Sequence, residues 1–169
     1  MSIDAVMRFL HFVGVVTWVG GMMFQMVSLQ PFLKVQDLPT KLPLLFPIIR
    51  RFLMMTWSSI TLLLISGSDM LIRVLVDQKV SLVSRMGMFL LFKFMLVGLM
   101  LILFGILFFG YFFDLRIHYR SLLKKPDEKI REEHFHAIEE MLPAMRNLTI
   151  ANLVIGLMVI LVIELAIYS

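Results

Sequence analysis

Four long apolar runs constrain this chain more than any other feature of its sequence. They cover roughly residues 3–29, 44–75, 83–113 and 144–168, and each exceeds the ~20 residues that a helix needs to cross a bilayer core. Backbone amides find no water in the bilayer core, so a spanning segment must be a helix or a strand of a closed barrel. The ~10-residue alternating segments of barrel strands are absent from this sequence. The sequence predicts an all-α integral membrane protein, a four-helix transmembrane bundle forming a single domain over residues 1–169.

Composition narrows the classes of function. The mean hydropathy of +0.91 and the 60% of hydrophobic residues require that long runs face lipid. The chain has no cysteine, which excludes disulfides, iron–sulfur clusters and thiol catalysis. Its formal charge of +4 comes from residues that flank the apolar runs, so it is a topology signal. We expect the lipid bilayer, and no nucleic acid, as a partner.

The basic residues are distributed unequally between the two sides of the membrane. Most lie in or beside the first and third connections, as Lys34, Lys41, Arg50, Arg51, Arg116, Arg120, Lys124, Lys125, Lys129, Arg131 and Arg146. By the positive-inside rule these connections are cytoplasmic and both termini lie outside, as expected for a multi-pass protein of a bacterial inner membrane. Glycines on more than one face of the third run favour a homodimer or a heteromeric complex.

The third connection contains a helical pattern over residues 126–142. Its apolar face carries Ile130, His134, Ile138 and Met141, and its polar face Glu133, His136 and Glu140. The pattern predicts an amphipathic helix that lies against the cytoplasmic face and ends at Pro143. Residues two apart point in different directions on a helix, so His134 and His136 favour a packed and a solvated histidine over a zinc site.

One ionisable residue, His11, lies in the middle of the first apolar run. An unpaired polar group inside hydrocarbon is costly, so the imidazole must bind something. Gly14, Trp18 and Gly21 share its helix face, and the small residues there allow a second backbone or a flat ligand to come close. Two explanations stay open, a hydrogen bond to a neighbouring helix and ligation of a metal or haem.

Lys93 lies at the same depth as His11. His11 follows Asp4 by seven residues, and Lys93 follows Arg85 by eight. Both helices enter from the same side, so each residue lies roughly 10–12 Å deep. Lys93 either extends to the interface, or pairs with Glu164 or a ligand carboxylate, or coordinates a metal as a neutral amine.

Motifs in all four runs resemble the CopD-like superfamily of membrane proteins. The first run reads LHFVGVVTWVGG over residues 10–21; the others carry Trp57 with Ser66-Gly67, Lys93 with Phe94, and Asn152 with Gly156. That superfamily includes copper-resistance proteins and is similar to the HemJ type of protoporphyrinogen oxidase. The HemJ resemblance implies a b-type haem that depends on His11 and Lys93.

Haem b is therefore the expected cofactor, with a role in electron transfer. A porphyrin is flat and apolar, and the expected cofactor-binding residues are His11, Lys93, Trp18, Gly14, Trp57 and Asn152. The HemJ side of the resemblance implies an oxidoreductase whose partner is a quinone or a porphyrin.

Two other functions stay open. One is copper transport or resistance through His11 and methionines, and the other is a structural subunit of a larger membrane complex. His118 and His134 form a second, weaker candidate pair for a metal or a cytoplasmic-side haem.

Overall fold

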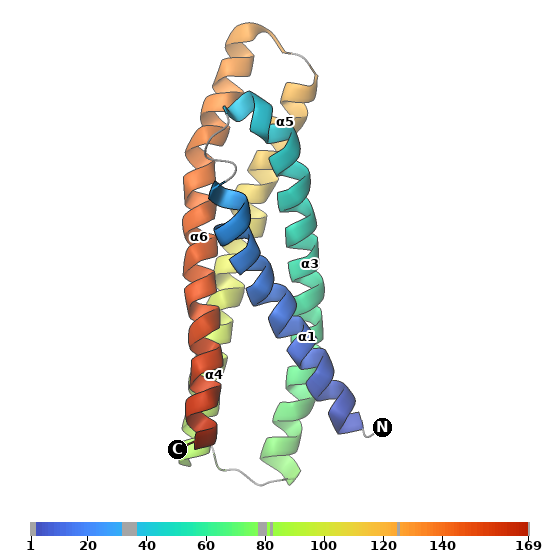
Figure 1. Cartoon of the computed structure of the whole chain (residues 1–169), viewed down its shortest axis with the longest axis vertical. Coiled ribbons are helices and arrows are strands. Elements are labelled where there is room, and N and C mark those ends of the chain that lie inside the picture. Colours follow the sequence, from blue (N-terminus) through green and yellow to red (C-terminus); the bar gives the residue numbers. More distant parts are fainter. Residues whose placement is uncertain (1–2, 32–36, 78–80, 82, 125, 169) are drawn as a thin grey trace.

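The computed structural model describes residues 3–31, 37–77, 81, 83–124 and 126–168, without the side chains of 77 and 163–168. All regular structure in these ranges is helical (Figure 1). The elements are α1 (Ile3–Phe24), π-helical η1 (Gln25–Leu29), α3 (Leu38–Ile72), η2 (Arg73–Asp77), α4 (Arg85–Gly105), η3 (Ile106–Phe112), α5 (Phe113–Leu123) and α6 (Glu128–Tyr168).

Four continuous helices are long and apolar enough to cross a membrane. They are Ile3–Leu29, Leu38–Val76, Arg85–Leu123 and Glu128–Val162. Large apolar side chains along them, such as Phe9, Met95 and Ile102, are exposed, as a lipid environment requires. The fold is that of a multi-pass membrane protein, which confirms the predicted all-α class.

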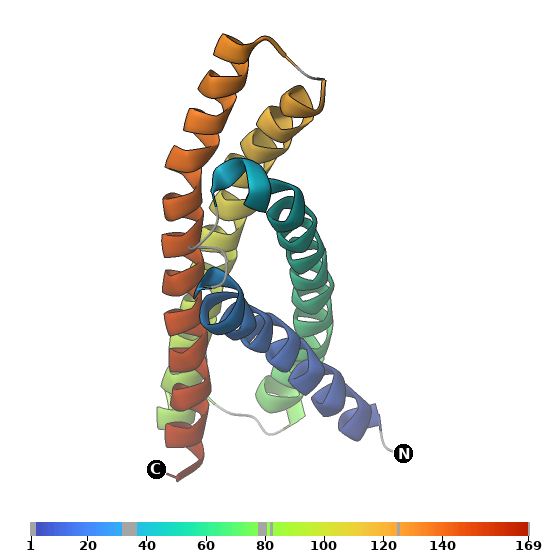
Figure 2. The ribbon, with the colours of Figure 1, turned by 45° about the horizontal axis from the view of Figure 1, so that its top comes forward.

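The spans form two antiparallel pairs. α1 packs on α3, and α4 with α5 packs on α6. α1 also contacts α6 along its second half, so the pairs join there. Towards the end that carries both termini the two pairs diverge, as both ribbon views show (Figures 1 and 2).

The predicted separate amphipathic helix over residues 126–142 is not present. Residues 128–142 instead form the first turns of α6, and the helix continues through Pro143. The segment packs along α5 with Ile138 fully buried, so it stands upright beside its neighbour. A proline removes one helical hydrogen bond; packing on both sides of Pro143, against α5 and α4, holds the helix together despite that loss.

Two predicted span boundaries also change. α3 begins at Leu38, whereas the sequence predicts that this span begins at residue 44. The earlier start is possible because Pro39 lies in the first turn, where the backbone N–H that proline lacks has no helical partner. Pro43 and Pro47 follow at four-residue spacing with exposed rings. The third span continues beyond residue 113 through α5, which reduces its connection to α6 to residues 124–127.

Gly14 lies where α1 crosses α3 most closely. A Cβ added to Gly14 would lie 2.8 Å from Leu63 Cγ and 3.3 Å from the Ser59 carbonyl oxygen. At Gly21 the ring of Phe52 would lie 3.0 Å from such a Cβ. These glycines therefore allow the close approach of a second helix, which is one of the two roles that the sequence predicts for them.

This packing predicts opposite effects for two alanine substitutions in α1. Gly14→Ala should lower the thermal stability of the purified protein, since overpacking costs about 1–3 kcal/mol. Gly20→Ala is the matched control: its Cβ would meet nothing within 4 Å, and the gain in helix propensity should leave stability equal or higher. Thermal unfolding in detergent measures both. Equal stability of the two variants would contradict the close crossing, and Leu63→Ala should partly restore Gly14→Ala.

Candidate functional site

His11 of α1 is held by α3. Its Nδ1 lies 3.1 Å from Ser66 Oγ, and Ser66 is fully buried. A Cβ on Gly67 would lie 3.4 Å from His11 Cε1, so the Nδ1–Cε1 edge of the imidazole packs against the α3 backbone. The hydrogen bond to a neighbouring helix that the sequence allows is therefore present.

The Ser66 hydroxyl fixes the tautomer of His11. Ser66 Oγ lies 2.6 Å from the Leu62 carbonyl oxygen, and two oxygens this close require the hydroxyl proton between them. Since that proton is donated to Leu62, Ser66 Oγ accepts from His11 Nδ1–H. In the neutral imidazole Nε2 then carries the lone pair, and it has no hydrogen-bond partner among the described residues.

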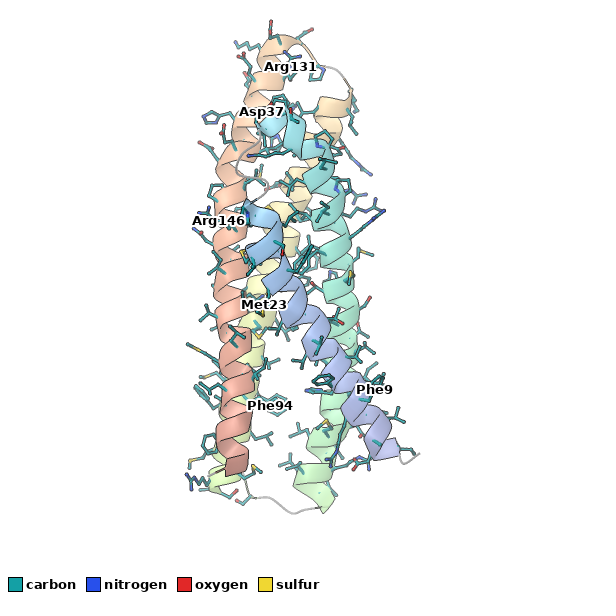
Figure 3. All side chains as sticks on the ribbon, viewed as in Figure 1. Phe9, Met23, Asp37, Phe94, Arg131 and Arg146 are labelled. Carbon is teal, nitrogen blue, oxygen red and sulfur yellow. The ribbon has the colours of Figure 1, made fainter. Side chains whose placement is uncertain are left out.

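Lys93 of α4 lies in the same neighbourhood as His11. It is half-buried and near enough that its charge acts on the imidazole. It forms no ion pair within 4 Å among the described side chains, which do not include that of Glu164. α1 and α4 belong to different helix pairs, and Phe9 and Phe94, close to His11 and Lys93 in sequence, lie at a similar height towards the end where the pairs diverge (Figure 3).

Trp18 and Trp57 belong to a different part of the bundle. Both rings pack edge-on against Phe104, with centroids 6.2 Å and 5.4 Å from it. Trp57 continues the contact to Phe108 at 5.5 Å. These aromatic side chains join the two helix pairs in the middle of the molecule, and Trp18 is almost completely buried there.

Asn152 also lies away from His11. Its Nδ2 donates to the Met100 carbonyl oxygen at 3.2 Å, which links α6 to α4. One turn further, Gly156 packs against Val19 of α1 and Met100. Val19 follows His11 by eight residues, or about 12 Å along the helix. Asn152, Trp18 and Trp57 therefore lie in the packed middle of the bundle, further from the termini than His11.

Gly14 faces α3 as His11 does, and Leu63 occupies the space beside it. The predicted site residues thus separate into His11 with Lys93 at the divergent end and a packed group in the middle. Among the described residues no three His, Asp or Glu side chains are grouped so as to hold a metal ion.

His118 and His134, the weaker predicted pair, do meet. Their Nδ1 atoms lie 2.8 Å apart across α5 and α6, so one ring donates to the other. The rings are edge-to-face with centroids 5.0 Å apart. The two Nδ1 atoms are engaged with each other, so this contact links α5 to α6 and leaves only the Nε2 atoms for a ligand. His136 lies on the exposed side, 3.6 Å from Glu140.

Two important contributors are not among the predicted site residues. Ser66 is one: the sequence analysis names it as a motif residue but not as the partner of His11. Phe104 is the other, and the four phenylalanines at 104, 108, 109 and 112 gave no indication of which ring would meet both tryptophans.

Comparison of the chain with known protein families, curated proteins and solved structures gives no match. The resemblance to the CopD-like superfamily therefore depends on the motif residues alone.

Removing the Ser66 hydroxyl should release the tautomer of His11. In Ser66→Ala the Nδ1–H loses its acceptor, a loss of about 1 kcal/mol or a roughly five-fold change in the tautomer ratio. Nitrogen NMR of histidine-labelled protein in nanodiscs measures that ratio. Ser68→Ala, an exposed serine on the same helix, is the control. An unchanged His11 signal in Ser66→Ala would contradict the assigned hydrogen bond.

The contact between α5 and α6 can be tested by crosslinking, because the chain has no cysteine of its own. His118→Cys with His134→Cys should be bridged by a single short bifunctional maleimide. His118→Cys with His136→Cys should carry two singly attached reagents, since residue 136 faces away. Intact mass distinguishes these products. Bridging in neither pair would favour a surface-lying amphipathic helix.

Proposed function

We propose that the protein binds haem b at His11 and transfers electrons within the membrane. The observation that carries this proposal is the hydrogen-bond relay from His11 Nδ1–H through Ser66 Oγ to the Leu62 carbonyl. Histidines that ligate a metal commonly donate their other ring N–H to a fixed acceptor, which sets the tautomer and the ring orientation. The relay leaves Nε2 as the ligand atom.

A porphyrin at His11 would lie towards the end of the bundle where the two helix pairs diverge (Figure 2). The packed aromatic side chains around Phe104 lie nearer the middle of the bundle. Lys93 approaches from the opposite pair and provides either a second iron ligand or a cation for a haem propionate. Trp18, Trp57, Asn152 and Gly14 support the site by fixing the helices rather than by touching the haem. The haem iron itself supplies one-electron chemistry.

The proposed orientation would put this site in the outer half of the membrane. Both termini lie at the end where the helices diverge (Figure 1), and the basic residues crowd the other end. We place both termini outside a bacterial inner membrane. A quinone or a porphyrin would reach His11 from the lipid, and a homodimer or a heteromeric complex would cover the remaining surface.

The absorption spectrum of the purified protein tests the proposal. The wild type should show a Soret band and about one haem per chain. His11→Ala should lose the haem or become five-coordinate with a shifted, broadened band. Ser66→Ala should weaken haem binding roughly 10–100-fold, as for other partners of ligating histidines. His136→Ala, at an exposed histidine, is the matched control and should leave the spectrum unchanged.

Lys93→Met separates the two roles of the lysine. Methionine can ligate iron but cannot pair with a propionate. Retained haem with a changed midpoint potential indicates ligation, and weaker retention with an unchanged spectrum indicates pairing.

Three results would count against haem at His11. A normal haem spectrum in His11→Ala would indicate that the haem binds elsewhere, with His118 and His134 as the next candidate ligands. A colourless protein that retains copper would support the CopD-like transport function. A protein with neither would support a structural subunit.

A further inference from the structure

A cavity of about 240 Å³ opens at the opposite end of the bundle from His11, between the end of α1, the beginning of α3 and the first half of α6. The buried side chains Leu45, Leu53 and Leu107 form its inner wall. At ~30 Å³ per water molecule it has room for about eight waters, which is the scale of a polar headgroup. Its polar lining includes Gln25, Gln30, Lys41, Glu139 and Arg146.

The cations of this cavity lack counter-ions. Lys41 and Arg146 are half-buried, and neither forms an ion pair within 4 Å in the part of the chain described. With the carboxylate of Glu139, the lining has a net charge of +1. Half-buried cations are stabilised by an anion that supplies both charge and hydrogen-bond acceptors. The lining is therefore complementary to a group with one negative charge.

Gln25 adds a hydrogen-bond acceptor. Its Oε1 is buried and has no hydrogen-bond partner in the described residues. A buried acceptor without a donor is unfavourable by about 1–3 kcal/mol. Gln25 begins the π-helical η1, and π-helical turns are frequent at functional sites. A suitable ligand thus combines an anion with a donor such as a hydroxyl.

We take the cavity to lie at the height of a headgroup layer, because it opens where α1 ends. Arg146 is on α6 at the level where α1 ends (Figure 3), and Gln25 directly follows α1. A second, more open cavity of about 380 Å³ shares Gln30 and Arg146 with the first, and its other lining residues are Met26, Pro31 and Ile150. Apolar side chains thus adjoin the charged site, as an amphiphile with acyl chains requires.

We propose that this cavity binds the headgroup of an acidic phospholipid. The phosphate lies between Lys41 and Arg146, a headgroup hydroxyl donates to Gln25 Oε1, and the acyl chains leave along the second cavity. Phosphatidylglycerol has this combination of one negative charge and hydroxyl donors. Acidic lipids are attracted to the basic side of membrane proteins. The cavity adds a binding site of defined shape to this general attraction.

Native mass spectrometry of the full chain tests this proposal. The protein is released from micelles doped equally with phosphatidylglycerol, phosphatidylethanolamine and phosphatidylcholine. The wild type should retain one phosphatidylglycerol in preference to the other two lipids. Lys41→Gln with Arg146→Gln should lower that retention at least ten-fold. Arg50→Gln with Arg51→Gln is the matched control, because it removes the same charge from exposed positions on α3, and it should retain the lipid.

Several outcomes would overturn the proposal. One is equal retention of the three lipids by the wild type, which needs no variant and so does not depend on variant folding. Another is equal loss in the control pair, which would indicate general attraction to the basic end. Preference for phosphatidylethanolamine, abolished in Glu139→Gln, would assign a zwitterionic headgroup instead. Gln25→Leu should weaken phosphatidylglycerol retention without removing charge, and no change there would also contradict the geometry.

Discussion

The close crossing of α1 over α3 at Gly14 determines much of this structure. Because Gly14 has no side chain, α1 approaches until Leu63 and the Ser59 carbonyl are in contact range. In this antiparallel register, moving three residues back along α1 corresponds to moving three residues on along α3. His11 therefore meets Ser66 and Gly67 and cannot turn to lipid. The helix crossing thereby converts a costly intramembrane polar residue into an oriented imidazole.

The bundle is packed unevenly along its length, and this organises its two candidate sites. In the middle, rings on α1, α3 and α4 pack around Phe104 and join the helix pairs. Towards the termini the pairs diverge (Figure 2), and His11 and Lys93 belong to different pairs, on α1 and α4. Towards the basic end, η1 and Pro143 border a cavity instead of close packing. The proposed redox ligand and the proposed lipid headgroup would thus lie at opposite ends of the bundle, on either side of its packed middle.

The long α6 shows how packing outweighs local signals. Pro143 and the change from charged to apolar residues predict two helices, yet one helix runs from Glu128. The reason is the third span, which extends as α5 to Leu123 and offers α6 a partner on both sides of the proline. The same extension brings His118 to His134, sixteen residues away in sequence. Local periodicity assigned the fully buried Ile138 to the apolar face correctly, but Ile130, predicted on the same face, is exposed.

The sequence by itself determined the class and the number of spans, because hydrocarbon imposes the length of a span. It indicated that His11 needs a partner, because an unpaired polar group in hydrocarbon is costly. It also indicated the depth shared by His11 and Lys93, since helical rise converts residue counts into distance. Only the tertiary structure decided which helix each polar residue meets. Ser66 as the partner of His11, and the distance of Asn152 from it, depend on crossings between segments some fifty residues apart. Glycine positions permit such crossings without specifying the facing helix, so the pairing of spans is a property of the assembled bundle.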